Sequence, residues 1–266
     1  LLFAEMVYQG NRYFRYQGMT MYNIKPYKAV FFDWDGTAVK SRTASDANVI
    51  QAMNQLLQKG INLLIISGTT YMNISGGKLE DKLTREALDH LYLGLARGAV
   101  NYGFRDGQLQ LLKDMTMPMD QTLQLHEACF HIHQHLLNEH DLKTDIVFSR
   151  PNYCKIDLLV EKDRKEQLFF SENDAVFADK LLKEKNFANG LKDVLIYAEQ
   201  LLKQEPLPLK TTTDTKYLEV GPTTKSDNVD YLLGILEEKG IGIEDCCFWG
   251  NEFGEMADGI MGSDSK

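Results

Sequence analysis

The chain has 266 residues, of which 44% are hydrophobic and 25% are charged, the composition of an ordinary soluble globular protein. Its length leaves room for a full core and for a smaller inserted domain. The formal net charge of −9 disfavours a nucleic-acid binder, which needs a basic face. A small anionic substrate stays compatible, because a magnesium ion or a lysine can reverse the field within one cleft.

The sequence also argues against a membrane protein and a disulfide-stapled protein. No run of about 18 apolar residues occurs, so we expect no membrane span. Residues 1–6 are too short for a signal peptide and follow no basic residue. The four cysteines form no C-x-x-C pair and fit neither a disulfide framework nor a zinc site. We therefore predict a cytoplasmic protein in a reducing setting.

Residues 1–28 form a polar and aromatic lead-in, in which two Tyr-Gln-Gly strings predict a hairpin. Residues 29–32 are apolar throughout, which predicts a buried strand without a polar face. Asp33-Trp34-Asp35-Gly36-Thr37 follows it. Open α/β sheets bind ligands at the carboxyl ends of their strands, and both carboxylates can start on one side of the chain. The alternative is a strand followed by an Asx-type turn.

A second strand leads to a polar signal at the same edge. Residues 45–59 have helical apolar spacing, with Ser45 or Asp46 as a possible N-cap. Residues 61–66 are again apolar and end in Ser67-Gly68. This β-α-β order predicts a right-handed crossover and two neighbouring parallel strands.

The middle of the chain changes in texture at about residue 114. Before it, residues 79–92 look helical, residues 98–101 look like a short strand, and residues 104–109 look like a hairpin. After it, the pattern predicts an inserted α+β domain. Its helices are expected at 121–138 and 167–185 and its strands at 145–149 and 153–159, while 191–204 mixes both signals.

Two further strands end in polar residues. Residues 217–220 are followed by Lys225 and an amphipathic helix that Gly240 ends. Residues 246–249 form another apolar strand, which leads to Asn251 and Glu255. Four apolar segments are thus each followed by a polar signal.

This arrangement resembles the haloacid dehalogenase superfamily, and most of all its Cof-type phosphatases, over roughly residues 27–263. The first motif of that family is matched by residues 33–37, the second by Ser67, the third by Lys225 and the fourth, imperfectly, by residues 250–255. The resemblance implies an α/β fold with a Rossmann-like parallel sheet, helices on both faces and an inserted α+β cap. The predicted domains are a lead-in at 1–28, core at 29–112, cap at 113–206 and core at 207–266.

The resemblance implies a magnesium-dependent phosphatase of small phosphorylated metabolites, with sugar phosphates as one subclass. Asp33 would be the nucleophile that forms an aspartyl-phosphate, and Asp35 the general acid and base. Ser67, Gly68 and Lys225 would bind the phosphate. Taken alone, Ser67 can instead be a helix N-cap, and Lys225 can be a solvated residue of the first helical turn.

The magnesium ligands implied are Asp33, Asp35, Asn251 and Glu255. The family usually has an aspartate where this chain has Asn251, and an asparagine adds an oxygen but no charge. The second hypothesis is therefore a catalytically impaired protein that binds a phosphorylated ligand or partner without turnover. A third is phosphoryl transfer between positions of a sugar, as in phosphomannomutase-like relatives.

The sequence supports expectations about three other features. Five histidines crowd residues 126–140, yet apolar residues explain that helix without a metal; they are His126, His131, His133, His135 and His140. Arg150 and Lys155 lie in the expected cap and are candidates for touching the substrate. The Cof type has further core strands after its fourth motif, so the sequence is expected to be either a piece of a longer protein or an abbreviated core.

Overall fold

The computed structural model describes residues 26–40, 43–161, 172–214, 216–250, 255–257, 260–262 and 264. They divide into two compact units. The first comprises the described residues up to 95, together with 101–113 and 229–249. The second comprises 96–100 and 114–228, together with the described residues from 250 onward. The predicted N-terminal hairpin lies outside the described residues.

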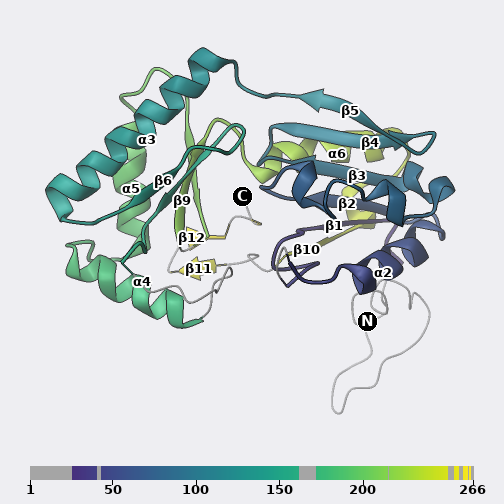
Figure 1. Ribbon diagram of the computed structural model, residues 1–266, viewed down its shortest axis with the longest axis horizontal. Helices are drawn as coiled ribbons and strands as arrows, with labels where there is room; N and C mark the ends of the chain where they lie inside the picture. The colour runs from purple at the N-terminus through teal and green to yellow at the C-terminus, as the bar shows by residue number, and fades with distance from the viewer. Residues whose placement is uncertain are drawn as a thin grey trace, which may run out of the picture. The chain divides into compact units, whose positions relative to one another are not determined.

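The first unit is built on a six-stranded sheet in the order β10-β1-β2-β3-β4-β5 (Figure 1). Parallel pairing joins β10 to β1, β1 to β2 and β2 to β3. The strands are β1 (Ala29–Phe32), β2 (Asn62–Ile66), β3 (Leu91–Leu95), β4 (Val100–Arg105), β5 (Gln108–Asp114) and β10 (Cys246–Trp249). The α/β fold with a Rossmann-like sheet is therefore confirmed, with β4 and β5 extending it.

Helices cover this sheet because its central strands have no polar face. Phe31 and Leu64 share a buried cluster with Leu232 and Leu236 of α6 (Lys225–Glu238). The residues that alternate with them on β1 and β2 are also fully buried, so neither face is open to water. Helix α2 (Ala47–Leu57) packs its apolar stripe beside β2 and begins after Asp46, one of the two predicted caps.

The second unit has a four-stranded antiparallel sheet in the order β6-β7-β9-β8. Its strands are β6 (Asp145–Val147), β7 (Cys154–Asp157), β8 (Lys210–Thr213) and β9 (Tyr217–Gly221). Helices α3 (Met119–His140), α4 (Glu172–Glu184) and α5 (Leu191–Leu202) contribute to one hydrophobic cluster with the sheet. A short antiparallel pair, β11 (Glu255–Ala257) and β12 (Ile260–Met261), completes the described part.

The two faces of this second sheet differ in polarity. Ile156, Leu218 and Val220 belong to the hydrophobic cluster with the helices. Because side chains alternate along a strand, Lys155 and Glu219 stand on the opposite face. The unit therefore has one face packed on helices and one face that carries charge.

Strand pairing continues past the expected boundary of the cap at residue 206. Strands β8 and β9 fall within the segment expected to be core, yet β9 pairs with β7 in register Leu218↔Ile156. The physical reason is that this pairing buries Leu218 against the helices of the second unit. The domain division itself stays a prediction.

The helix expected at 79–92 is wrong. The chain there forms two short 3-10 helices, Glu80–Lys82 and Arg85–His90, and then β3. The backbone is extended at Leu83 and Thr84, and the Thr84 N–H donates to Asn54 Oδ1 of α2 at 2.8 Å. A side chain from another helix thus takes the donor that a continuous helix would have used.

The strand expected at 98–101 begins only at Val100, because residues 96–99 form a turn. Most other expected elements agree with the structure within a few residues, and 191–204, which had mixed signals, is the helix α5. Among the described residues, we find no helix with the length and apolar character needed to span a bilayer.

Replacing Leu218 by alanine should expose the packing of β9 directly. The buried leucine contributes about 2–5 kcal/mol, and its loss should loosen only the unit that contains it. Hydrogen exchange read by mass spectrometry should show faster exchange in α3 and β7 and unchanged exchange in β1 and β2. The exposed Lys180→Ala on α4 is the control. Equal loss of protection in β1 and β2 would contradict this assignment.

Candidate functional site

The first candidate catalytic residue, Asp33, lies where sequence analysis placed it, directly after β1. Its N–H donates to the carbonyl of Trp249 at 3.0 Å, which ties it to the end of β10. The preceding pair Phe32↔Ile65 fixes β1 against β2 as well. Asp33 is therefore held from two sides at the carboxyl edge of the sheet, and it is buried, with 7% of its surface exposed.

The loop after Asp33 is closed by its own hydrogen bonds. Trp34 is buried, and its carbonyl accepts the N–H groups of both Ala38 and Val39. The Gly36 N–H donates to the Val39 carbonyl at 2.9 Å, and Gly36 has φ 86°, which a glycine adopts without strain. Asp35 forms an isolated bridge with Val39. The two acids therefore flank a buried tryptophan on a rigid loop, which suits a catalytic pair better than a simple Asx turn.

Ser67 follows β2 at the same edge. Its N–H donates to the Gly94 carbonyl at 2.9 Å, and the residue is 2% exposed. Its Oγ accepts the N–H of Thr69 at 3.4 Å. The next helical turn has Thr70 at its N-cap position, so Ser67 is not a helix N-cap. Gly68 continues this loop and is partly exposed.

The residues at this edge suit a magnesium ion. Magnesium prefers oxygen ligands and keeps several waters, so it needs only one or two protein carboxylates. Asp33 and Asp35 supply that number from one loop. No cluster of three or more histidine, cysteine or acidic side chains suited to a metal occurs among the described residues.

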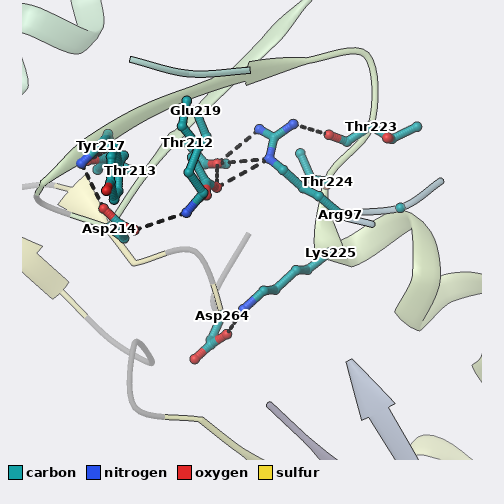
Figure 2. Close-up of polar contacts among 12 residues, drawn as sticks. Arg97, Thr212, Thr213, Asp214, Tyr217, Glu219, Thr223, Thr224, Lys225 and Asp264 are labelled. Atoms are coloured by element: carbon teal, nitrogen blue, oxygen red, sulfur yellow. Dashed lines mark hydrogen bonds and ion pairs between the residues drawn. The ribbon is translucent and has the colours of Figure 1, made fainter. Parts of the chain in front are cut away.

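Lys225 is the first residue of α6, and its side chain is only 14% exposed (Figure 2). Its Nζ lies 2.6 Å from Oδ1 of Asp264, whose side chain is 4% exposed. Lys225 is therefore not a solvated residue of a helical turn. Asp264 was not among the predicted site residues, because the predicted fourth motif ended at Glu255; an acid further along the chain was the available signal.

Asn251 and Glu255 are the other two predicted magnesium ligands. Asn251 lies outside the described residues. Glu255 begins β11, where it pairs with Met261. Their roles remain predictions.

Arg97 forms the centre of a buried polar cluster in the second unit (Figure 2). It is 2% exposed, and its guanidinium donates to Thr212 Oγ1 from Nε at 3.2 Å and from Nη2 at 2.9 Å. It also donates to the backbone carbonyl of Thr223 and lies 3.4 Å from Glu219. Nothing in the sequence pattern had singled out this arginine.

Lys155 completes the cluster with a second positive charge. Its Nζ lies 2.8 Å from Glu219 and 3.3 Å from Asp214. Burial alone would raise the pKa of Glu219, but the charges of Lys155 and Arg97 outweigh burial and hold this pKa well below its usual range. Burial lowers the pKa of Lys155, but the two carboxylates raise it by more. The pKa of Lys155 is therefore above its usual value. Lys155 is thus engaged in ion pairs.

The histidines of α3 do not assemble a metal site among the described residues. His131 contacts Glu205 at 3.0 Å, and His135 contacts Glu139 at 2.6 Å within its own helix. His140 stacks on Phe187 with ring centroids 4.1 Å apart. These partners support the expectation of a polar helix face.

The acid sensitivity of folding should report the Glu219 cluster. Glu219 has a lower pKa in the folded chain, about 2, than in the unfolded chain, about 4.3. Its contribution is therefore complete above the unfolded pKa and is lost as pH falls towards 2. Glu219→Gln should lower the free energy of unfolding at pH 7 by about 3–5 kcal/mol, because two buried cations lose a countercharge.

The same variant should show a shallower loss of stability between pH 5 and pH 2 in urea denaturation. The exposed Glu161→Gln, which removes a surface pair with Lys143, is the control. Identical pH slopes in wild type and Glu219→Gln would contradict the assignment.

Comparison with known proteins finds similar folds among solved structures but no similar sequence. No protein-family model matches the chain, and neither does any curated protein sequence. Among solved structures, it is similar to IMP-nucleotidase of Plasmodium falciparum, truncated at its N-terminus. The form bound to IMP shares 12% identity at a TM-score of 0.57 and is matched over 85% of this chain and 60% of that one.

A second structure of that truncated nucleotidase has a TM-score of 0.57 and 12% identity, over 90% of this chain and 63% of that one. The chain therefore spans about 60% of the length of these proteins. At this identity the likeness speaks for the fold. The likeness shows a shared fold, and the acids, serine and lysine that follow its strands are the residues on which the resemblance to the haloacid dehalogenase superfamily rests.

Proposed function

We propose that the chain is a magnesium-dependent phosphatase of small phosphorylated metabolites. The observation that carries the proposal is the rigid loop that holds Asp33 and Asp35 on either side of buried Trp34, at the same sheet edge as buried Ser67. Two carboxylates in such a position match the two roles that phosphate-ester hydrolysis needs, a nucleophile and a proton donor.

The chemistry divides hydrolysis into two steps. A carboxylate oxygen of Asp33 attacks phosphorus, the ester P–O bond breaks, and the departing alcohol takes the proton of Asp35. A water molecule then attacks the phosphorus of the aspartyl-phosphate and gives a proton to Asp35. The acyl-phosphate P–O bond breaks, which releases phosphate and restores both carboxyl groups to their starting states.

Magnesium, held by Asp33 and the Asp35 segment, would neutralise charge on the phosphoryl group and on the two neighbouring acids. Ser67 and Gly68 offer hydrogen-bond donors at this edge, and Lys225 offers a positive charge. Asp264 pairs with that lysine. We propose that Asp264 is an acid of the fourth loop that orients Lys225, a role not predicted from the sequence.

The substrate class is a small phosphate monoester. The similar nucleotidase is described with IMP bound, so nucleoside monophosphates join sugar phosphates as candidates. Residues 113–206, nearly all of them in the second unit, are the proposed cap, which would select among them. Arg150, in this unit, remains the candidate anion contact, because Lys155 is already paired with Glu219 and Asp214.

The second candidate function is phosphoryl-ligand binding without turnover. Asn251 favours it, because an amide in place of a carboxylate removes one negative charge from the expected magnesium ligands. Both functions share the fold, so fold does not decide between them.

A panel of sugar phosphates and nucleoside monophosphates, assayed for phosphate release with and without magnesium, tests the proposal. We expect release that requires magnesium. Asp35→Asn should lower kcat by about 10²–10⁴-fold, and Asp33→Asn should abolish turnover. Asp106→Asn, in the tight turn after β4, removes an acid away from this edge and should leave kcat unchanged. A silent panel, with phosphate still binding to the protein, would favour the second function.

Asn251→Asp should tighten magnesium binding and raise turnover, because the added carboxylate supplies the missing charge. The magnesium concentration at half-maximal activity and kcat are the two measurements. No change in either would show that Asn251 is not a limiting ligand. The control is Asn138→Asp, which adds the same charge at an exposed position near the end of α3.

A further inference from the structure

The turn between β3 and β4 has an unusual backbone. Ala96 has φ 53°, Arg97 has φ 54° and Gly98 has φ 99°, so three consecutive residues are left-handed. For the two residues with side chains, such a conformation is strained. Tertiary contacts must therefore stabilise this turn. The partners of its residues indicate which part of the structure the turn positions.

Arg97 projects from this turn onto the connection between β9 and α6. It donates to the Thr223 carbonyl, two residues before Lys225, and fixes its other donors on Thr212 and Glu219 (Figure 2). Gly221, at the start of the connection, has no room for a side chain: an added Cβ would lie 2.9 Å from the Arg97 guanidinium. The arginine thus packs along the connection as well as bonding to it.

Gly98 and Asn228 hold the same connection from the helical side. The Gly98 N–H donates to Asn228 Oδ1 at 2.7 Å, and Asn228 Nδ2 donates to the Val100 carbonyl at 3.0 Å. Asn228 is fully buried. A Cβ added at Gly98 would lie 2.5 Å from the carbonyl oxygen of Thr224. The turn is therefore in close contact with the residue that precedes Lys225.

We propose that Arg97 and Asn228 are positioning residues for Lys225. One fixes the chain just before the lysine, and the other fixes the helix three residues after it. A free lysine side chain has many rotamers, so anchoring its backbone and pairing it with Asp264 both lower the entropic cost of presenting its charge. The importance of Lys225 for an anion rests on the proposed function; the positioning does not.

The ion pairs of the cluster support a positioning role for Arg97. Glu219 and Asp214 face Arg97 and Lys155, so these two cations are matched by two acids. Arg97 can therefore hold the connection without itself attracting a phosphate. Its planar fork bonds to several partners at once, which a lysine in its place cannot do.

The test measures the coupling between Lys225 and Asp264 without using catalysis. Urea denaturation of Lys225→Met, Asp264→Asn and the double variant gives their coupling in the wild-type background. The same cycle is repeated in Arg97→Lys and in Asn228→Ser. We expect the coupling to fall by at least half in both. If Arg97→Lys does not fold, Asn228→Ser carries the test.

Lys155→Met is the matched control, because it removes the other cation of the cluster, whose described ion pairs are with Glu219 and Asp214 rather than with residues 222–224. It should lower overall stability and leave the coupling between Lys225 and Asp264 intact. A coupling that survives in Arg97→Lys and Asn228→Ser, or that falls equally in Lys155→Met, would overturn the proposal and leave Arg97 as a purely structural residue.

A kinetic arm separates this proposal from the proposed function. With an active substrate, Arg97→Lys should raise KM roughly tenfold in the wild-type background and should have no further effect on KM in Lys225→Met. An additional rise in the Lys225→Met background would overturn positioning through the lysine. A silent substrate panel would count against the proposed function alone, since the stability cycle needs no turnover.

Discussion

The burial of β1 on both faces is the constraint on which the first unit depends. The strand lies between β2 and β10, and all four of its side chains are buried. A strand without a polar face can end only where the sheet ends, so the charged residues that follow it must emerge at the carboxyl edge. The hydrogen bond from Asp33 to Trp249 and the parallel register with β2 then fix that edge to within one residue.

A comparable constraint organises the second unit, but it is electrostatic. Removing Arg97, Lys155 and Glu219 from water is expensive, and their mutual attraction repays this only when every donor finds a partner. Buried ion pairs of this kind contribute little net stability, yet they tolerate few alternative arrangements. The cluster therefore defines how the turn after β3, the strand β9 and the start of α6 fit together.

The two kinds of constraint suit the two kinds of residue that the proposed chemistry needs. A nucleophile and an acid work at short range, so a sheet edge with a hydrogen-bonded loop holds them well. A lysine is a long and flexible point charge, and its position depends on where its backbone is anchored and on which acid it meets. Helix α6 begins at that lysine, and further along it contributes Leu232 to the core cluster of the first unit.

Local patterns in the amino-acid sequence were sufficient to predict several features of the structure. Apolar runs located β1, β2 and β10, periodicity located α2 and α3, and the strand-end residues Asp33 and Ser67 followed from them. These features survive in the structure because burial along one strand or one helix face is already encoded in neighbouring residues. The four strand-end signals, taken together and in order, indicated the fold.

Features that depend on contacts between distant residues could not be predicted from these local patterns. Asn54 interrupts a helix expected at 79–92 by binding Thr84, 30 residues away. Asp264 meets Lys225 across 39 positions, and Arg97 meets Thr223 across 126. Such contacts leave no periodic trace in the sequence, because each is a single pair of side chains or a side chain and one carbonyl. Their geometry arises only when the sheets and helices have packed.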